Sequence, residues 1–252
     1  MIAQDDYRLS HRGDELAASY VKDFTERLPG RYWHEVEQPL LAGLLGEALR
    51  RDLGEVRHLD VASGTGRVLA YLQPKTAGST AIDISEEMLA HAKLAAPEAS
   101  FVVGDASVME FAEPFDLVTA FRFFLNAGPE LRSAVLARIR ANLADDGLLV
   151  ANVHAQPYSS LGIWRTLKAS SGRRSDSTLS IAAFRQLLES HGFEVVADRT
   201  YGYLPLTRKV GPGFLSTAFC AVDRLLNRLL PARNPFACYW LVAARPAARP
   251  AA

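Results

Sequence analysis

The sequence lacks several features that would assign a protein to a class at once. Its two cysteines, Cys220 and Cys238, are too few for a disulfide framework or a zinc site, and both lie among apolar residues, as buried thiols do. Basic and acidic residues balance at 28 each. Duplex-binding proteins usually carry a basic surplus that neutralises phosphates, so we expect no nucleic-acid partner. The one short basic candidate, 170–177, is typical of a solvated loop.

Long apolar runs and metal-ligand clusters are also missing. Nowhere do 18 uncharged apolar residues follow one another, which predicts no membrane span. The first residues, "MIAQDDYRLSHRGDE", show no basic segment followed by an apolar run, so we expect a cytoplasmic protein without a signal peptide. No His, Cys and Asp residues have metal-ligand spacing, so we expect no metal.

What the sequence does contain is a regular alternation of strand and helix patterns. Residues 12–28 and 36–51 have helical spacing of apolar residues, separated by "PGRYWHE". Strands are expected at 56–62, 79–83, 100–104, 115–121, 147–154, 193–204 and 236–245, with helices near 66–73, 86–95, 129–144 and 180–191. Such alternation favours an α/β fold with a doubly wound, mostly parallel sheet, because parallel neighbours need crossover connections.

We expect a single domain over residues 1–252. Its parts would be an N-terminal helical cap (1–54), a core that binds a cofactor (55–154) and a half that contacts the molecule accepting the transferred group (155–252). The last part contains a helical insertion at 212–231.

The stretch "HLDVASGTGRVLAYL" (58–72) predicts a buried strand, a glycine turn and a helix, which is how nucleotide-type cofactors are held. Asp83 closes the second strand, where an acid accepts hydrogen bonds from a ribose diol. These features also fit a nicotinamide dinucleotide site. The dinucleotide fingerprint, however, needs a third glycine where this chain has Leu69. A further acid, Asp105, closes the third strand and suits an adenine amino group.

Five consecutive segments together resemble the motifs of class I S-adenosylmethionine-dependent methyltransferases: "LDVASGTG", "AIDISEEMLAHAK", "FVVGDAS", "FDLVTAFRFFLN" and "LADDGLLVANV". The resemblance covers roughly residues 56–154. It implies a seven-stranded sheet of order 3-2-1-4-5-7-6 with the last strand antiparallel and helices on both faces. It also implies S-adenosylmethionine as the cofactor.

The resemblance assigns cofactor contacts residue by residue. Asp60, Ala62, Gly64 and Gly66 would surround the methionine moiety, Asp83 would hold the ribose, Ile84, Asp105 and Ala106 would contact the adenine, and Phe121 would lie near the sulfonium. The family's first motif glycine is Ala62 here, and alanine suits that turn if its φ is negative. Asp60 and Asp116 have an alternative reading as acids that cap a strand end or loop.

Acceptor contacts are expected from Arg122, Asn126 and His154. Arg122 and Asn126 would orient a polar acceptor, and His154 would act as a base, because the unshifted pKa of a histidine lies near neutrality. The alternatives are an arginine paired with a surface acid and a structural histidine. Residues 28–41 also offer Arg31, Tyr32, Trp33 or His34 to the methionine carboxylate or the acceptor, or serve only interhelical packing.

Helix 214–230 places its apolar residues on one stripe, with charged and amide side chains opposite. This stripe predicts that the helix packs on the body of the domain. The alternatives are that it lines a pocket for an apolar acceptor, contacts a membrane surface peripherally or contacts a second subunit. The protein would be a monomer or homodimer. Residues 160–168 predict a short helix, with Tyr158 and Trp164 as aromatic surface for an acceptor.

The sequence therefore predicts a methyltransferase acting on an oxygen or nitrogen of a small-molecule or lipid-like acceptor. RNA or protein methylation is the first alternative, and it needs a basic groove built from Arg173, Arg174, Arg208 and Lys209. A non-catalytic binding subunit is the second, and its only support is Ala62. An NAD-dependent oxidoreductase ranks last because of the missing glycine.

Overall fold

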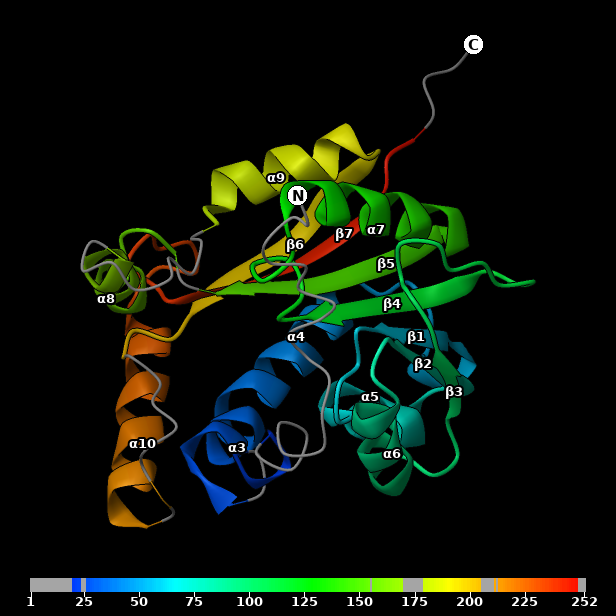
Figure 1. Cartoon of the computed structure of the whole chain (residues 1–252). Coiled ribbons are helices and arrows are strands. Elements are labelled where there is room, and N and C mark those ends of the chain that lie inside the picture. The colour runs from blue at the N-terminus through cyan, green and yellow to red at the C-terminus, as the bar shows by residue number, and fades with distance from the viewer. Residues whose placement is uncertain are drawn as a thin grey trace, which may run out of the picture.

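The computed structural model describes residues 20–23, 26–154, 156–169, 179–204, 211 and 213–248 (Figure 1), with Arg165, Lys168 and Ala169 described by their backbone alone. Most of the predicted helix 12–28 and the basic segment 170–177 lie outside the described residues, as do Arg208 and Lys209.

Seven strands form one sheet of order β3-β2-β1-β4-β5-β7-β6, which confirms the predicted order. The first five strands in this order run parallel, and β7 is antiparallel to both β5 and β6. The strands are β1 (Arg57–Val61), β2 (Gly78–Asp83), β3 (Ser100–Val103), β4 (Phe115–Phe121), β5 (Leu143–His154), β6 (Phe193–Tyr201) and β7 (Tyr239–Pro246). β5 begins four residues earlier than the sequence predicts, and β6 ends three residues earlier.

Helices cover both faces of this sheet (Figure 1). α7 and α9 pack on one face, and α4 and α5 pack on the other. The helical elements are α3 (Leu28–Tyr32), η1 (Trp33–Glu37), α4 (Gln38–Ala48), η2 (Leu53–Glu55), α5 (Arg67–Leu72), η3 (Gln73–Lys75), α6 (Glu86–Ala95), α7 (Pro129–Asn142), α8 (Ser160–Ala169), α9 (Ile181–Ser190) and α10 (Phe214–Leu229). None of the described helices is long and apolar enough to cross a membrane.

The central strands are apolar on both faces, as strands buried between two helical layers must be. In β4 the alternation of side chains sends Val118 and Ala120 into the core under α7 and α9. Leu117 and Phe121 enter the second core, with α3, η1 and α4. The sheet thus separates two cores, and its carboxyl ends meet at one edge.

The segment "PGRYWHE" is helical, contrary to its predicted role as a separator between two helices. Pro29 lies in the first turn of α3, where its missing N–H costs no hydrogen bond. The chain continues through the π-helical turn η1 into α4. This turn carries Glu37 into the interior, where its side chain is buried.

Candidate cofactor and acceptor site

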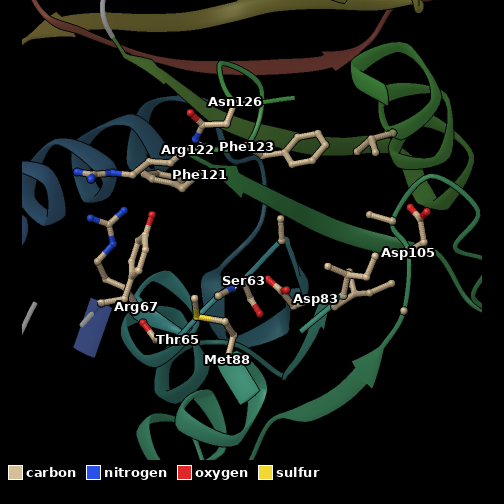
Figure 2. Close-up of a pocket in the computed structure, with 18 of the residues that line it drawn as sticks. Ser63, Thr65, Arg67, Asp83, Met88, Asp105, Phe121, Arg122, Phe123 and Asn126 are labelled. Carbon is tan, nitrogen blue, oxygen red and sulfur yellow. Dashed lines mark hydrogen bonds between the residues drawn. The ribbon is translucent and has the colours of Figure 1, made fainter. Parts of the chain in front are cut away.

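A cavity of about 230 Å³ opens where the carboxyl ends of β1, β2, β4 and β5 meet (Figure 2). Doubly wound sheets bind ligands at this position. The predicted residues that line it are Ala62, Gly64, Asp83, Ile84, Asp105, Ala106, Phe121, Arg122, Asn126 and His154. Asp60 and Gly66 are not among its lining residues: Asp60 is buried within β1, and Gly66 is the last left-handed residue of the turn that follows β1.

In the turn after β1, every second residue from Ala62 to Gly66 has a left-handed backbone conformation. Ala62 has φ 52°, Gly64 55° and Gly66 79°. Ala62 therefore does not have the negative φ that would make alanine suitable in this turn, and its Cβ makes the left-handed conformation unfavourable by roughly 1–2 kcal/mol. Gly66 has a second constraint, since a Cβ there would lie 2.8 Å from the Cβ of Ala92 in α6.

Asp83 stands at the centre of the cavity, at the end of β2 (Figure 2). Its Oδ2 accepts a hydrogen bond from the Gly64 N–H at 2.8 Å, and its Oδ1 accepts one from the Ser85 N–H at 3.0 Å. Ser85 caps α6 by accepting from the Met88 N–H. The carboxylate therefore joins the glycine turn to the start of the next helix.

Asp105 lies at one end of the cavity. The Gly104 N–H donates to the Asp83 carbonyl oxygen at 2.9 Å, which holds the chain after β3 beside the chain after β2. The Asp105 side chain accepts from the Ser107 N–H. The apolar residues Ile84 and Leu131 also line the cavity. An acid beside apolar walls suits a planar base with an amino group.

Arg67 and Arg122 lie at the opposite end, beyond Asp83 (Figure 2). The Glu37 carboxylate stands between them, 3.0 Å from Nη1 of Arg67 and 3.7 Å from Nη2 of Arg122. The Tyr201 hydroxyl donates to the same carboxylate at 2.9 Å. Two guanidinium cations therefore contact one buried carboxylate at this end of the cavity.

The pKa shifts of the two guanidiniums reflect this sharing. Burial lowers the pKa of Arg67 to about 10, with Glu37 opposing the shift. Burial acts the same way on Arg122, but Glu37, Tyr239 and Tyr201 outweigh it and hold its pKa above the usual value. Both groups remain cations at neutral pH.

The three predicted acceptor residues all line the cavity. Arg122 has φ 59°, and its N–H donates to the Asn152 side chain at 2.7 Å. Asn126 donates to the Arg122 carbonyl oxygen at 2.6 Å. His154 lines the same cavity from the end of β5. A left-handed arginine at a strand end is strain of the kind found at functional sites.

For residues 31–34 the structure supports packing, which is one of the two roles that the sequence analysis left open. Arg31 donates to Thr217, and Tyr32 donates to Asp223. Trp33 packs edge-on against Phe121, and His34 is exposed. None of these four is among the lining residues, so in the described part of the chain their contacts are those of interhelical packing.

Arg67 and Ser63, which line the cavity, were not predicted as site residues, and neither was Glu37. Arg67 directly follows Gly66, so the available signal was its place at the first position of the helix after the turn. Glu37 gave no signal, because only the π-helical turn brings it inward. Within the described residues, no group of three or more His, Cys, Asp or Glu side chains has the arrangement of a metal site.

The sequence and the fold both match known methyltransferases. Residues 59–147 match the family described as "Methyltransferase domain". A demethylmenaquinone methyltransferase of Beutenbergia cavernae is 27% identical over 161 residues, which are 63% of this chain and 63% of that protein. The match thus spans less than two thirds of the curated relative's length.

Solved structures extend the likeness in fold to the rest of the chain. A magnesium protoporphyrin IX methyltransferase from Synechocystis with bound S-adenosylhomocysteine is 15% identical, with a TM-score of 0.63 over 96% of this chain and 99% of that one. An S-adenosylmethionine-dependent methyltransferase from Clostridium acetobutylicum is 12% identical, with a TM-score of 0.62 over 94% and 100% of the two chains.

Proposed function

We propose that this chain, which belongs to the class I S-adenosylmethionine-dependent methyltransferases, methylates an oxygen or nitrogen of a small-molecule or lipid-like acceptor. The observation that carries the proposal is the order of charges along the cavity. An acid lies at one end, an acid at the centre and two cations at the other end.

The residues fit the cofactor of this family in that order. Asp105 and Ala106 would face the adenine, and Asp83 would accept from the ribose hydroxyls. Arg67 and Arg122 would bind the methionine carboxylate, a role that the sequence analysis left open for residues 31–34. Ala62 and Gly64 would bring the backbone close to the methionine moiety, while Asp60 and Gly66 would support that turn from outside the cavity.

When bound, S-adenosylmethionine supplies a methyl carbon activated by a positively charged sulfur. The chain's own contribution is then alignment and exclusion of water. Phe121 would present its ring to the reacting end of the cavity, held in place by Trp33. Asn126 would orient the acceptor, whereas Arg122, which the sequence assigned to the acceptor, would bind the methionine carboxylate instead. His154 would take the proton of a hydroxyl acceptor, whereas a carboxylate or a neutral amine needs no base.

Two observations favour a small or lipid-like acceptor over a nucleic acid. The charge of the chain is balanced, and the acceptor end of the cavity is lined by aromatic residues, Phe121 and Phe123. The methyltransferases named above for demethylmenaquinone and magnesium protoporphyrin IX also have small-molecule acceptors in their names.

The direct test is a turnover screen. The protein is incubated with S-adenosylmethionine and a panel of apolar metabolites bearing carboxyl, hydroxyl or amino groups, and acceptor-dependent S-adenosylhomocysteine is measured. With a hydroxyl acceptor, His154→Gln should lower kcat by about a hundredfold or more without changing cofactor affinity. Activity confined to RNA or protein substrates would overturn the acceptor assignment.

A non-catalytic binding subunit is a second candidate because of the strained turn at Ala62. It predicts no S-adenosylhomocysteine with any acceptor in the natural chain. Ala62→Gly distinguishes a weakened enzyme, in which the substitution increases turnover, from a protein without catalytic function, in which it does not.

A further inference from the structure

Helix α10 faces the domain with its polar side. The side chains buried against the body are Ser216, Cys220 and Asp223, all fully covered. The side chains turned to solvent are apolar, with exposures of 84% for Phe214, 72% for Leu215, 47% for Val222, 54% for Leu225 and 72% for Leu229. This is the reverse of the usual orientation of an amphipathic helix on a folded domain.

Buried hydrogen bonds fix this orientation. Asp223 accepts from the Tyr32 hydroxyl at 2.7 Å and from the Tyr203 N–H at 2.8 Å. Asn227, one turn later, accepts from the Gly202 N–H at 3.1 Å. A rotation of α10 that turned its apolar side toward the domain would break all three hydrogen bonds. It would also expose the polar side chains that make them. The exposed apolar face is therefore a built feature of the fold.

Helix α8 lies at the same end of the molecule as α10 (Figure 1), and it also has exposed apolar side chains. Ile163 is 50% exposed, Trp164 55% and Leu167 65%. The two helices are tied to one segment, since Ser160 at the start of α8 donates to the Tyr203 carbonyl oxygen and the Tyr203 N–H donates to Asp223 of α10. The exposed apolar residues of α8 and α10 are called here the α8–α10 surface.

The solvent-exposed charged side chains of α10 are all positive. The only acid of the helix is Asp223, which is buried, and the charged side chains on its exposed flank are Arg224 and Arg228. Arg224 also pairs with Glu35 at 3.3 Å. Bulky apolar side chains beside arginines are the pattern of helices that lie in the interface of an anionic bilayer.

The charge of this face favours an anionic bilayer over a second copy of the chain. Two copies that met through α10 would bring Arg224 and Arg228 of each copy to the same interface, where like charges repel, whereas anionic lipids attract them. A bilayer also needs no matching shape in its partner.

We propose that the α8–α10 surface docks this protein on a membrane carrying anionic lipids. The proposal is independent of the proposed function, because it rests on residues outside the cavity.

Vesicle sedimentation tests the proposal with the full chain. Vesicles of equal parts phosphatidylglycerol and phosphatidylcholine should carry down the protein, and vesicles of phosphatidylcholine alone should carry down much less. The double variant Leu225→Glu and Leu229→Glu should lose about tenfold or more of the binding. Leu94→Glu is the matched control, because Leu94 is 83% exposed on α6, away from this surface, and its variant should bind unchanged.

A second readout comes from tryptophan fluorescence. Trp33 and Trp240 are buried, whereas Trp164 belongs to the surface, so a blue shift on adding anionic vesicles should vanish in Trp164→Phe. Equal binding of the double variant and the natural chain would overturn the proposal, as would no binding to either vesicle. So would a dimer in solution that the double variant dissociates, since it would assign the surface to a second copy. Circular dichroism of each variant verifies its folding.

Discussion

The carboxylate of Asp83 accepts a hydrogen bond from the backbone N–H of Gly64 at 2.8 Å. The acid at the end of β2 thus fixes the turn at the end of β1, 19 residues away in sequence. In the proposed complex the same carboxylate holds the ribose. A single side chain would then both shape the site and bind the ligand, so its substitution affects stability as well as affinity.

Asp83→Asn should weaken the binding of S-adenosylmethionine and of S-adenosylhomocysteine equally, by about tenfold or more. The amide places a donor where the carboxylate accepts charge-assisted hydrogen bonds, which contribute about 1.5–3 kcal/mol each. Calorimetry of both ligands measures the loss. Asp145→Asn, at an acid whose side chain is 96% exposed, is the control and should bind like the natural chain.

Arg67→Gln should lower the affinity for both ligands by about tenfold while leaving the fold intact. The substitution removes one of the two cations at the end assigned to the methionine carboxylate, a group that both ligands share. Arg57→Gln serves as the control, because Arg57 is exposed at the start of β1, at the other edge of the sheet. Unchanged affinity in Arg67→Gln would remove this residue from the site.

Ala62→Gly should raise the free energy of unfolding by about 0.5–1 kcal/mol. The left-handed φ of 52° is unfavourable for alanine, and the relief exceeds the greater chain entropy of glycine in the unfolded state. Urea unfolding measures the difference. Ala81→Gly, in the buried strand β2, should instead destabilise the protein. If Ala62→Gly is also destabilising, then the turn is not strained.

His58 and Asp60 are joined through one hydroxyl. Thr119 Oγ donates to Asp60 Oδ1 at 2.6 Å and lies 2.8 Å from Nε2 of His58. Burial lowers the pKa of His58 to about 3 and raises that of Asp60 to about 7. Between pH 4 and pH 6 His58 therefore makes stability increase with pH, because only the unfolded chain binds its proton. Asp60 makes stability decrease with pH over the same range, because only the folded chain keeps the Asp60 carboxyl group protonated.

The two slopes should largely cancel in the natural chain. Asp60→Asn removes the opposing one, so its stability should increase by up to about 1.4 kcal/mol per pH unit between about pH 4 and pH 6. Urea unfolding at several pH values tests this. The same pH dependence in the natural chain and in Asp60→Asn would contradict the assigned protonation states.

The sheet could be predicted from the sequence because its strands are short apolar runs that alternate with helical patterns. The position of Asp83 and Asp105 followed, since the carboxyl ends of parallel strands share one edge. The left-handed conformation of Ala62 could not be predicted, because the backbone angles of a turn depend on the positions of the strand and the helix that it connects. Neither did the orientation of α10, which Tyr32 and Tyr203 fix through Asp223 from distant parts of the chain.

The central claim is that the cavity at the ends of β1, β2 and β4 binds S-adenosylmethionine. Isothermal titration of the natural chain with S-adenosylmethionine, and separately with S-adenosylhomocysteine, tests it most directly. We predict one site per chain with micromolar affinity for both ligands. The absence of binding to either ligand by the folded protein would contradict the account.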